Sequence, residues 1–214
     1  MKKILDTFRQ GHHEFENGRI DDFEGVNPFD LFELWTTEAV ENKENEPNAF
    51  VLATVNESGQ SSSRIVYLKD IIENKFVFYT NYNSQKGRDI ESNPKVSMLF
   101  FWPGTSRQVR IEGHCSKVHS DTSDAYFASR PRGSQIGAWA SNQSEELTNR
   151  EVLEAQFEAF ESKFPGEIPR PEHWGGYWID PSKIEFWQGR PSRLHDRIQF
   201  EKNEDTWKNR RLNP

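Results

Sequence analysis

The sequence has a single cysteine, no long apolar run and no excess of cationic residues. Cys115 alone cannot form an intramolecular disulfide. No stretch is apolar enough to span a bilayer, and the first residues lack the apolar run of a signal peptide, so we expect a cytoplasmic protein. The net charge of −7 disfavours a general binder of nucleic acid or membrane surfaces, because such proteins are rich in Lys and Arg.

The composition fits one folded domain with a polar N-terminal arm. At 214 residues the chain can bury a sizeable core, and we expect a single domain over residues 27–214. Residues 1–26 show no sustained period and are expected to form a mobile arm. This arm contains His12-His13, but no Cys or acidic residue is spaced to complete a metal site. The 7 Trp and 16 Phe predict flat buried surfaces in a core, at a subunit interface or around a planar ligand.

Strand patterns outnumber helical ones. Asn27-Pro28 predicts a helix start, with apolar residues at helical spacing at Phe29, Phe32, Trp35 and Ala39. Other helices are predicted at 84–90, 120–130 and 145–164. Strands are predicted at 49–55, 62–68, 75–80, 96–102, 108–118, around Tyr177 and Ile184, and at 197–200. Consecutive strands with short turns favour a mainly β fold, an antiparallel barrel with helices packed at its ends.

Two cationic clusters lie in strand-like segments. Arg64 and Lys69 flank an apolar, β-branched stretch, and Arg193, His195 and Arg197 fall within five residues. Buried charges need partners, so both clusters are candidate sites. Since an odd separation places two residues on opposite faces of an ideal strand, Arg64 and Lys69 are expected to serve different groups.

Two further segments could bind an anion. Ser84-Gln85-Lys86 opens a predicted helix just after Tyr79-Thr80, and free N–H groups at a helix start favour phosphate. Tyr126, Arg130 and Ser134 are spaced by four, as on one side of a helix. Pro131 interrupts that path, or else it begins a second helix with Arg130 at the junction.

These motifs together resemble the pyridoxamine 5'-phosphate oxidase family. The resemblance runs from about Pro28 to Pro214 and rests on Arg64-Ile65-Val66-Tyr67-Leu68-Lys69, on the segment from Tyr126 to Trp139, and on Arg193-Leu194-His195-Asp196-Arg197. It implies an FMN-binding split β-barrel that works as a homodimer. It also implies oxidation of pyridoxamine 5'-phosphate or pyridoxine 5'-phosphate to pyridoxal 5'-phosphate by O2, in vitamin B6 synthesis and salvage. The products include hydrogen peroxide and, from the amine, ammonia.

The resemblance also implies a role for each site residue. Arg193 and His195 are the implied catalytic residues. At the FMN site, Gln85 stands where the family usually has Arg, and Arg88, one turn away, is a candidate substitute for the missing cation. The implied substrate-binding residues are Lys69, Tyr126, Arg130, Ser134, Arg193 and His195. The implied FMN-binding residues are Arg64, Lys69, Tyr79, Thr80, Ser84, Gln85, Lys86, Gln108, Gln143, Ser144, Trp187 and Arg197.

Two alternatives from other classes stay open. A split barrel that carries flavin or pyridoxal phosphate without turnover would have the same fold. Such a module has no use for the substrate-binding set, which is complete here. A reductase using a nicotinamide donor is the other alternative, but the sequence has no Gly-x-Gly-x-x-Gly motif.

Overall fold

The computed structural model describes Phe15, Ile20 and residues 23–214, so the arm predicted over 1–26 lies mostly outside the described residues. The contacts of the chain divide it into two compact units. The first unit is the described part of Met1–Pro47 together with Leu99–Ile111 and Lys183–Pro214, and the second is Asn48–Met98 with Glu112–Ser182. Because each unit combines distant segments, the division gives no linear boundary, and the single domain over 27–214 stays a prediction.

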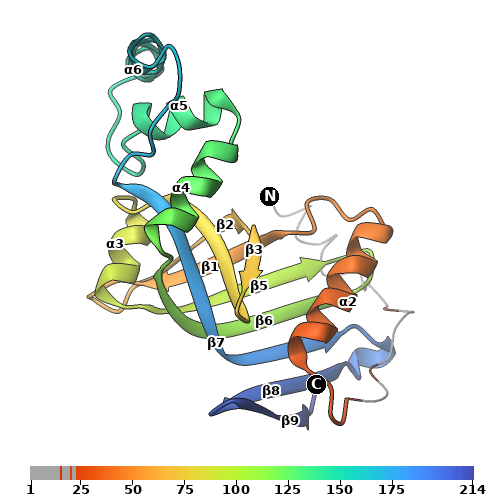
Figure 1. The fold of residues 1–214 in the computed structure, drawn as a ribbon. Coiled ribbons are helices and arrows are strands. Elements are labelled where there is room, and N and C mark those ends of the chain that lie inside the picture. Colours follow the sequence, from red (N-terminus) through yellow and green to blue (C-terminus); the bar gives the residue numbers. More distant parts are fainter. Residues whose placement is uncertain (1–14, 16–19, 21–22) are drawn as a thin grey trace, which may run out of the picture. The chain divides into compact units, whose positions relative to one another are not determined.

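The described residues are mainly antiparallel strands with helices, as predicted (Figure 1). The helices are α2 (Pro28–Glu41), α3 (Gln85–Ser92), α4 (Ser120–Ser129), α5 (Arg132–Ala140), α6 (Arg150–Lys163) and the short η1 (Pro191–Arg193). The strands are β1 (Ala49–Val55), β2 (Ser61–Tyr67), β3 (Asp70–Ile72), β4 (Lys75–Asn81), β5 (Lys95–Trp102), β6 (Arg107–Lys117), β7 (Trp174–Gln188), β8 (Asp196–Asn203) and β9 (Thr206–Leu212). The strands pair in the order β2-β1-β5-β6-β7-β4-β3, and β8 pairs with β7 and β9.

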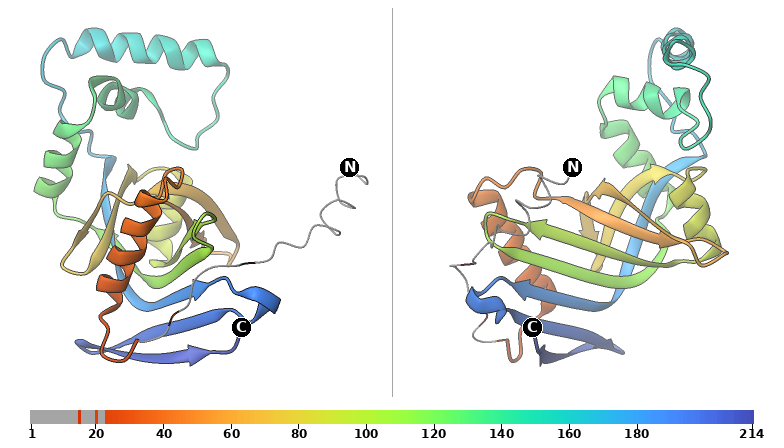
Figure 2. Two further views of the ribbon diagram at one scale, coloured as in Figure 1. Left: turned by 90° about the vertical axis from the view of Figure 1, so that its right-hand side faces the viewer. Right: turned by 180° about the vertical axis from the view of Figure 1, so that it is seen from behind.

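Helix α2 of the first unit begins where its sequence predicted. The Asn27 side chain accepts a hydrogen bond from the Phe29 N–H at 2.9 Å, and Pro28 occupies the first helical position. The buried face of the helix packs on strands of the same unit. Phe32 lies 5.2 Å from Phe100, and Trp35 lies 5.1 Å from Phe186, between ring centroids. Figure 2 shows the helix beside these strands from two further sides.

Strand β9 of the first unit was not predicted. It pairs with β8 from Thr206 opposite Asn203 to Leu212 opposite Arg197. Every residue of β9 is half-buried or exposed, so the strand lacks the alternation of buried apolar residues that marks a strand in a sequence. The strand is therefore recognised by its backbone pairing with β8 and not by the pattern of its side chains.

The hairpin of β1 and β2 in the second unit is confirmed. The Asn56 side chain accepts hydrogen bonds from the backbone N–H groups of Ser58 (3.0 Å) and Gln60 (2.9 Å). Gly59 has a φ of +82°, which favours glycine at this turn. Strand β1 buries alternate residues, and its buried face carries Phe50, Leu52 and Thr54.

After β2 the chain changes its pairing partner, which corrects the expected placement of Lys69. The Leu68 N–H donates to the Asn48 carbonyl at 2.8 Å, whereas the Lys69 N–H donates to the Val77 carbonyl of β4 at 2.9 Å. Strand β2 ends at Tyr67, so the strict alternation assumed between Arg64 and Lys69 does not hold. The short β3 that follows was not predicted.

The strands predicted separately around Tyr177 and Ile184 are parts of one long strand, β7. Its first half pairs with β4, with Tyr79 opposite Gly176, and its second half pairs with β8. Pro181 lies between the two paired stretches, where the missing N–H disrupts neither ladder.

The helical segment of the second unit resolves the alternative at Pro131. Helix α4 ends at Ser129, Arg130 is its C-cap, and α5 begins at Arg132, so the second helix with Arg130 at the junction is confirmed. Helix α6 begins at Arg150 rather than 145, because Asn149 caps it by accepting from the Val152 N–H at 3.0 Å.

Candidate functional site

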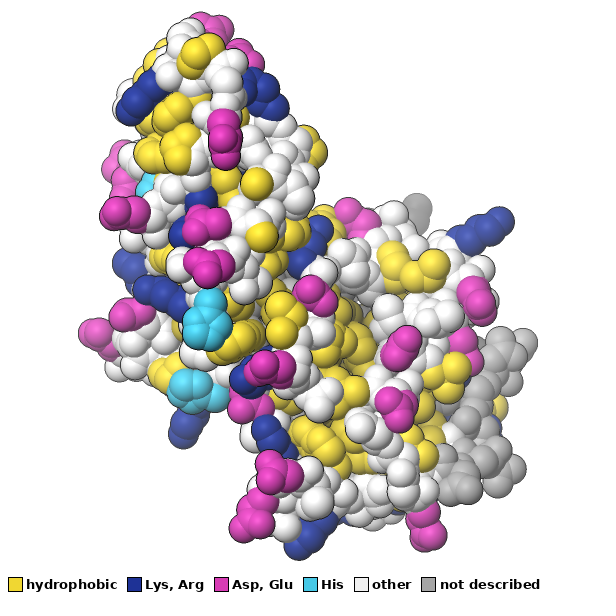
Figure 3. All heavy atoms as spheres, in the orientation of Figure 1, with side chains coloured by type: hydrophobic (Ala, Val, Ile, Leu, Met, Phe, Trp, Pro, Cys, Tyr) yellow, Lys and Arg dark blue, Asp and Glu magenta, His cyan; other side chains and the backbone are white. Residues whose placement is uncertain are grey.

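A cavity of about 600 Å³ lies in the second unit. Among the described residues that line it there is no Asp or Glu, although acidic side chains are scattered over the face seen in Figure 3. The cavity gathers eight of the predicted site residues: Arg64, Lys69, Tyr79, Thr80, Lys86, Arg130, Ser134 and Gln143. In a chain with a net charge of −7, four lining cations with no carboxylate among the described lining residues indicate an anion site.

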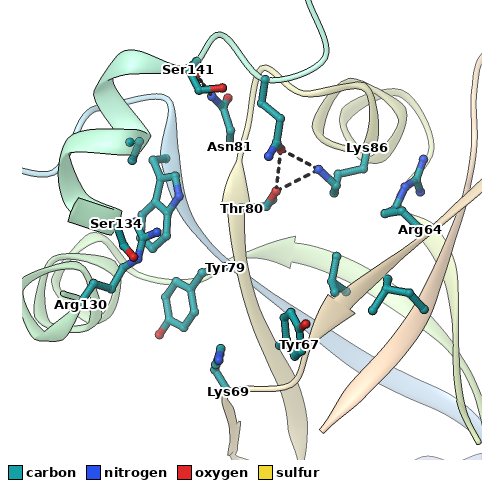
Figure 4. A pocket seen from close by; sticks show the side chains of 16 residues that line it. Arg64, Tyr67, Lys69, Tyr79, Thr80, Asn81, Lys86, Arg130, Ser134 and Ser141 are labelled. Carbon is teal, nitrogen blue, oxygen red and sulfur yellow. Dashed lines mark hydrogen bonds between the residues drawn. The ribbon is translucent and has the colours of Figure 1, made fainter. Parts of the chain in front are cut away.

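Lys86 and Arg64 form the first cationic group, on one side of β4 (Figure 4). The Lys86 ammonium donates to Gln143 Oε1 at 2.8 Å and to Thr80 Oγ1 at 3.2 Å. Burial, with a smaller contribution from the charge of Arg64, lowers the pKa of Lys86 to about 8. An anion placed here would stabilise the protonated form of Lys86 and so offset the free energy that burial of the charge costs.

The Arg64 guanidinium is held by the two strands of the hairpin. Its Nη1 donates to Thr54 Oγ1 at 2.7 Å, and its Nη2 donates to Ser62 Oγ at 2.9 Å. The Asp89 carboxylate lies 3.8 Å from Nη2. Burial lowers the pKa of Arg64, and Asp89 opposes that shift. These contacts orient the cation beside Lys86.

Arg130 and Ser134 form the second cationic group, on the other side of β4 (Figure 4). The guanidinium of Arg130 lies 4.4 Å from the ring centroid of Trp174. Its Nη1 is buried and has no hydrogen-bond partner among the described residues, and burial lowers the pKa of Arg130. An unsatisfied buried donor of this kind fits an anionic ligand. Trp174 both packs in an apolar cluster and lines the cavity.

Tyr126, a predicted substrate-binding residue, is not among the residues that line the cavity. Its ring stacks on Tyr79 with centroids 3.8 Å apart, and Tyr79 is the one of the pair that lines the cavity. Burial, followed by the nearby charge of Asp70, raises the pKa of Tyr79 to about 12. Both phenols are therefore neutral hydrogen-bonding groups at physiological pH.

Helix α3 begins next to Ser84, as predicted, and the phosphate contacts expected at its start stay predictions. Ser84 is fully buried and caps the helix, accepting from the Gly87 N–H, while it donates to the Asn81 carbonyl at 2.7 Å. Gln85 is exposed. Arg88 donates to the Asn83 carbonyl and lines a different cavity, so its suggested compensation for Gln85 has no support in the geometry.

The first unit carries the predicted residues Gln108, Trp187, Arg193, His195 and Arg197. The Nδ1 of His195 accepts a hydrogen bond from the Arg190 N–H at 3.1 Å, so the proton of the neutral ring is on Nε2. Burial and the charge of Arg193 lower the pKa of His195. The ring lies 4.6 Å from that of Trp187. Arg193 is exposed and has a φ of +62°, a strained conformation often found at functional sites.

Arg197 is already paired within its own unit. The buried Glu185 accepts from its Nε and its Nη2, each at 3.1 Å, and the Asn213 carbonyl accepts from Nη1 at 2.9 Å. Gln108 is half-buried on β6 of the same unit. In the second unit, Ser144 is exposed with a φ of +74°. FMN contacts by Gln108, Ser144 and Arg197 stay predictions.

Sequence reasoning missed the residues that hold the predicted ones in place. Thr54 and Asp89 contact Arg64 in the second unit, and Glu185 contacts Arg197 in the first. The only signal for Thr54 is one hydroxyl on an otherwise apolar strand face, which on its own predicts a core position.

The fold and cavity define a class of protein, an antiparallel β-protein with helices whose cationic cavity suits phosphorylated small molecules. The chain belongs to the pyridoxamine 5'-phosphate oxidase family. The family model described as pyridoxamine 5'-phosphate oxidase matches residues 36–164, and that described as the pyridoxine 5'-phosphate oxidase C-terminal dimerisation region matches residues 174–214. The predicted family is thereby confirmed.

Individual relatives agree with the family models. The chain is 54% identical to pyridoxine/pyridoxamine 5'-phosphate oxidase of Leptospira biflexa, over 89% of this chain and 90% of that protein. It is 52% identical to the protein of the same name from Haemophilus influenzae, over 88% and 90%. The crystal structure of PhzG from Burkholderia lata 383, in complex with tetrahydrophenazine-1-carboxylic acid, covers 93% of this chain and 99% of its own at 29% identity, with a TM-score of 0.87.

A second solved structure supports the fold alone. It is a pyridoxamine 5'-phosphate oxidase-related, FMN binding protein from Nostoc punctiforme, with a TM-score of 0.72 and 17% identity, covering 89% of this chain and 100% of its own. Together with the PhzG structure, it confirms the predicted split-barrel class. None of the helices formed by the described residues is long and apolar enough to cross a bilayer.

Proposed function

We propose that the protein is an FMN-dependent oxidase that converts pyridoxamine 5'-phosphate or pyridoxine 5'-phosphate to pyridoxal 5'-phosphate with O2 as acceptor. The observation that carries the proposal is a cavity with two cationic groups and, among the described residues, no carboxylate in its lining. Two phosphorylated ligands, a flavin nucleotide and a substrate, need two such groups. The names of the relatives at 52% and 54% identity support this choice of reaction.

The residues of the first cationic group fit the phosphate of FMN. Lys86 and Arg64 supply charge, and Thr80 adds a hydroxyl, in a space where burial makes an uncompensated ammonium costly. When bound, FMN would supply the electron acceptor that O2 then reoxidises. Gln143 would contribute an amide from its position against Lys86.

The second cationic group fits the 5'-phosphate of the substrate. Arg130 presents a buried donor without a partner among the described residues, and Ser134 adds a hydroxyl from α5. Lys69 lines the same cavity and is its fourth cation. A phosphate held at this point would fix the substrate ring in position, since orientation lowers the barrier to reaction.

Arg193 and His195 are proposed to act on the substrate ring. The guanidinium of Arg193 is planar and can stack on a flat ring. His195 is neutral, with its proton on Nε2, so it can donate a hydrogen bond while Nδ1 is held by the Arg190 N–H. Their role is to bind and polarise the substrate.

The protein is further proposed to act as a homodimer with FMN at the subunit interface. The segment matching the C-terminal dimerisation region, residues 174–214, contains Trp187, Arg193, His195 and Arg197. The same segment would then serve both assembly and the site.

Aerobic turnover of pyridoxamine 5'-phosphate by protein reconstituted with FMN tests the function. We expect aldehyde and hydrogen peroxide to form in equal amounts, and unphosphorylated pyridoxamine to react far more slowly. Yellow protein that yields neither product would instead indicate a flavin-binding module. Equal rates with and without the substrate phosphate would contradict the role given to Arg130.

A further inference from the structure

Thr54 is a buried hydroxyl to which no role in the reaction has been given. It lies on β1 in the second unit, on the same face as Phe50 and Leu52, and has 0% exposure. A hydroxyl at such a position must be hydrogen-bonded, because burying it without a partner is costly. Its two partners are both charged, and one of them lines the cationic cavity.

Thr54 bridges Arg64 and Asp89 through two hydrogen bonds. The Thr54 hydroxyl donates to Asp89 Oδ2 at 2.6 Å and accepts from Arg64 Nη1 at 2.7 Å. A threonine hydroxyl has one proton to donate, and here it donates that proton to the carboxylate in a hydrogen bond. The oxygen lone pairs therefore accept from the guanidinium. Asp89 is buried and lies 3.8 Å from Arg64 Nη2, beyond direct hydrogen bonding.

The other contacts of Arg64 Nη1 are weaker. The carbonyls of Leu52 and Ser62 accept from it at 3.3 Å and 3.2 Å, against 2.7 Å for Thr54. Bonds that involve a charged partner are stronger when they are short. Thr54 therefore contributes most to the orientation of Nη1.

We propose that Thr54, with its proton held by Asp89, is a positioning residue that presents the Arg64 guanidinium to the phosphate of a bound flavin nucleotide. The inference rests on the proposed function, which places that phosphate at Arg64 and Lys86. Thr54 does not touch the ligand, since it is absent from the residues that line the cavity. Its effect on binding passes through Arg64.

The test compares FMN with riboflavin, which is the same flavin without the phosphate. Full-length protein freed of flavin is titrated with each ligand, and the dissociation constant is read from the quenching of flavin fluorescence. Thr54→Val keeps the shape of the side chain and removes the hydroxyl, whereas Thr54→Ser keeps the hydroxyl. We expect Thr54→Val to weaken FMN binding about tenfold, the loss of one charge-assisted hydrogen bond, and to leave riboflavin binding unchanged.

Thr54→Ser is expected to bind FMN within about twofold of the unmodified protein. Equal weakening of FMN and riboflavin by Thr54→Val would overturn the proposal, because it would mean a general structural role. Unchanged FMN binding would overturn it as well. If Thr54→Val folds poorly, Thr54→Ala allows the same comparison, with riboflavin binding as the check on folding.

Arg64→Met separates this inference from the proposed function. If Arg64→Met still prefers FMN over riboflavin as strongly as the unmodified protein, the phosphate assignment itself fails. If Arg64→Met loses the preference and Thr54→Val keeps it, only the positioning role of Thr54 fails.

Discussion

Raising the pH from 7 to 9 is expected to weaken FMN binding about tenfold, because Lys86 loses its proton. In the unliganded protein, burial lowers the pKa of Lys86 to about 8, and only the protonated side chain attracts a phosphate dianion. Lys86 is buried and contacts the uncharged groups of Thr80, Ser84 and Gln143. None of these three side chains can replace the missing charge.

The magnitude follows from the fraction of protonated lysine. With a pKa of about 8, that fraction is roughly nine-tenths at pH 7 and roughly one-tenth at pH 9. The phosphate of FMN stays doubly charged across this range, since its second pKa is about 6. The dissociation constant should therefore rise about tenfold between the two pH values.

Fluorescence titration at several pH values measures this effect, with two controls. Riboflavin lacks the phosphate, so its binding should not change with pH through Lys86. Lys86→Arg carries a charge that persists above pH 9, so its FMN affinity should be nearly flat. A tenfold loss that appears equally in Lys86→Arg or with riboflavin would refute the assignment of the effect to Lys86.

The stability of the unliganded protein should increase as the pH rises, whereas the affinity for FMN should fall. The folded-state pKa of Lys86 is lowered below its ordinary value of 10.5, so between pH 8 and 10.5 the unfolded chain binds the extra proton. Stability from this group therefore increases as the pH rises through that window. Urea unfolding of unliganded protein and of Lys86→Met should show the increase only in the former.

Three further predictions concern other parts of the chain. Gly87→Ala should cost about 3 kcal/mol or more, because its Cβ would lie 1.9 Å from the Tyr82 carbonyl oxygen, whereas Gly133→Ala, with nothing within 4 Å, should not destabilise; urea unfolding compares them. Arg130→Met should raise the KM for pyridoxamine 5'-phosphate at least about thirtyfold with the FMN dissociation constant unchanged, and weakened FMN binding would contradict the separation of the two cationic groups. Glu185→Gln should lower stability by about 2 kcal/mol, less than for a fully buried pair because the Arg197 side chain keeps 25% exposure; a melting temperature equal to that of the unmodified protein would contradict this.

Local signals in the sequence were sufficient for many of the elements. Helix α2 follows from Asn27 and Pro28, because a cap and a fixed φ act within a few residues. The hairpin of β1 and β2 follows from alternation on each side of a turn that contains Gly59. Strands β3 and β9 were missed because neither shows a regular alternation of buried apolar residues.

The sequence could identify individual residues of the candidate site but not their arrangement around one cavity. Arg64, Lys86 and Arg130 were each conspicuous as cations in strand-like or junction segments. Their gathering in one cavity depends on β4, which pairs with β7 and lies between the two cationic groups. Ser84 is a buried helix cap, and its predicted phosphate contact stays a prediction because one hydroxyl can serve either purpose.

The sequence by itself determined the family, the capped helices and most of the strands, because caps, turns and alternation depend on neighbours within a few positions. Only the tertiary structure decided which side chains meet. Thr54 has the pattern of a core residue, yet folding places it between Asp89, 35 positions away, and Arg64 on the paired strand. Pairing between distant segments sets such contacts, and no local pattern in the chain encodes them.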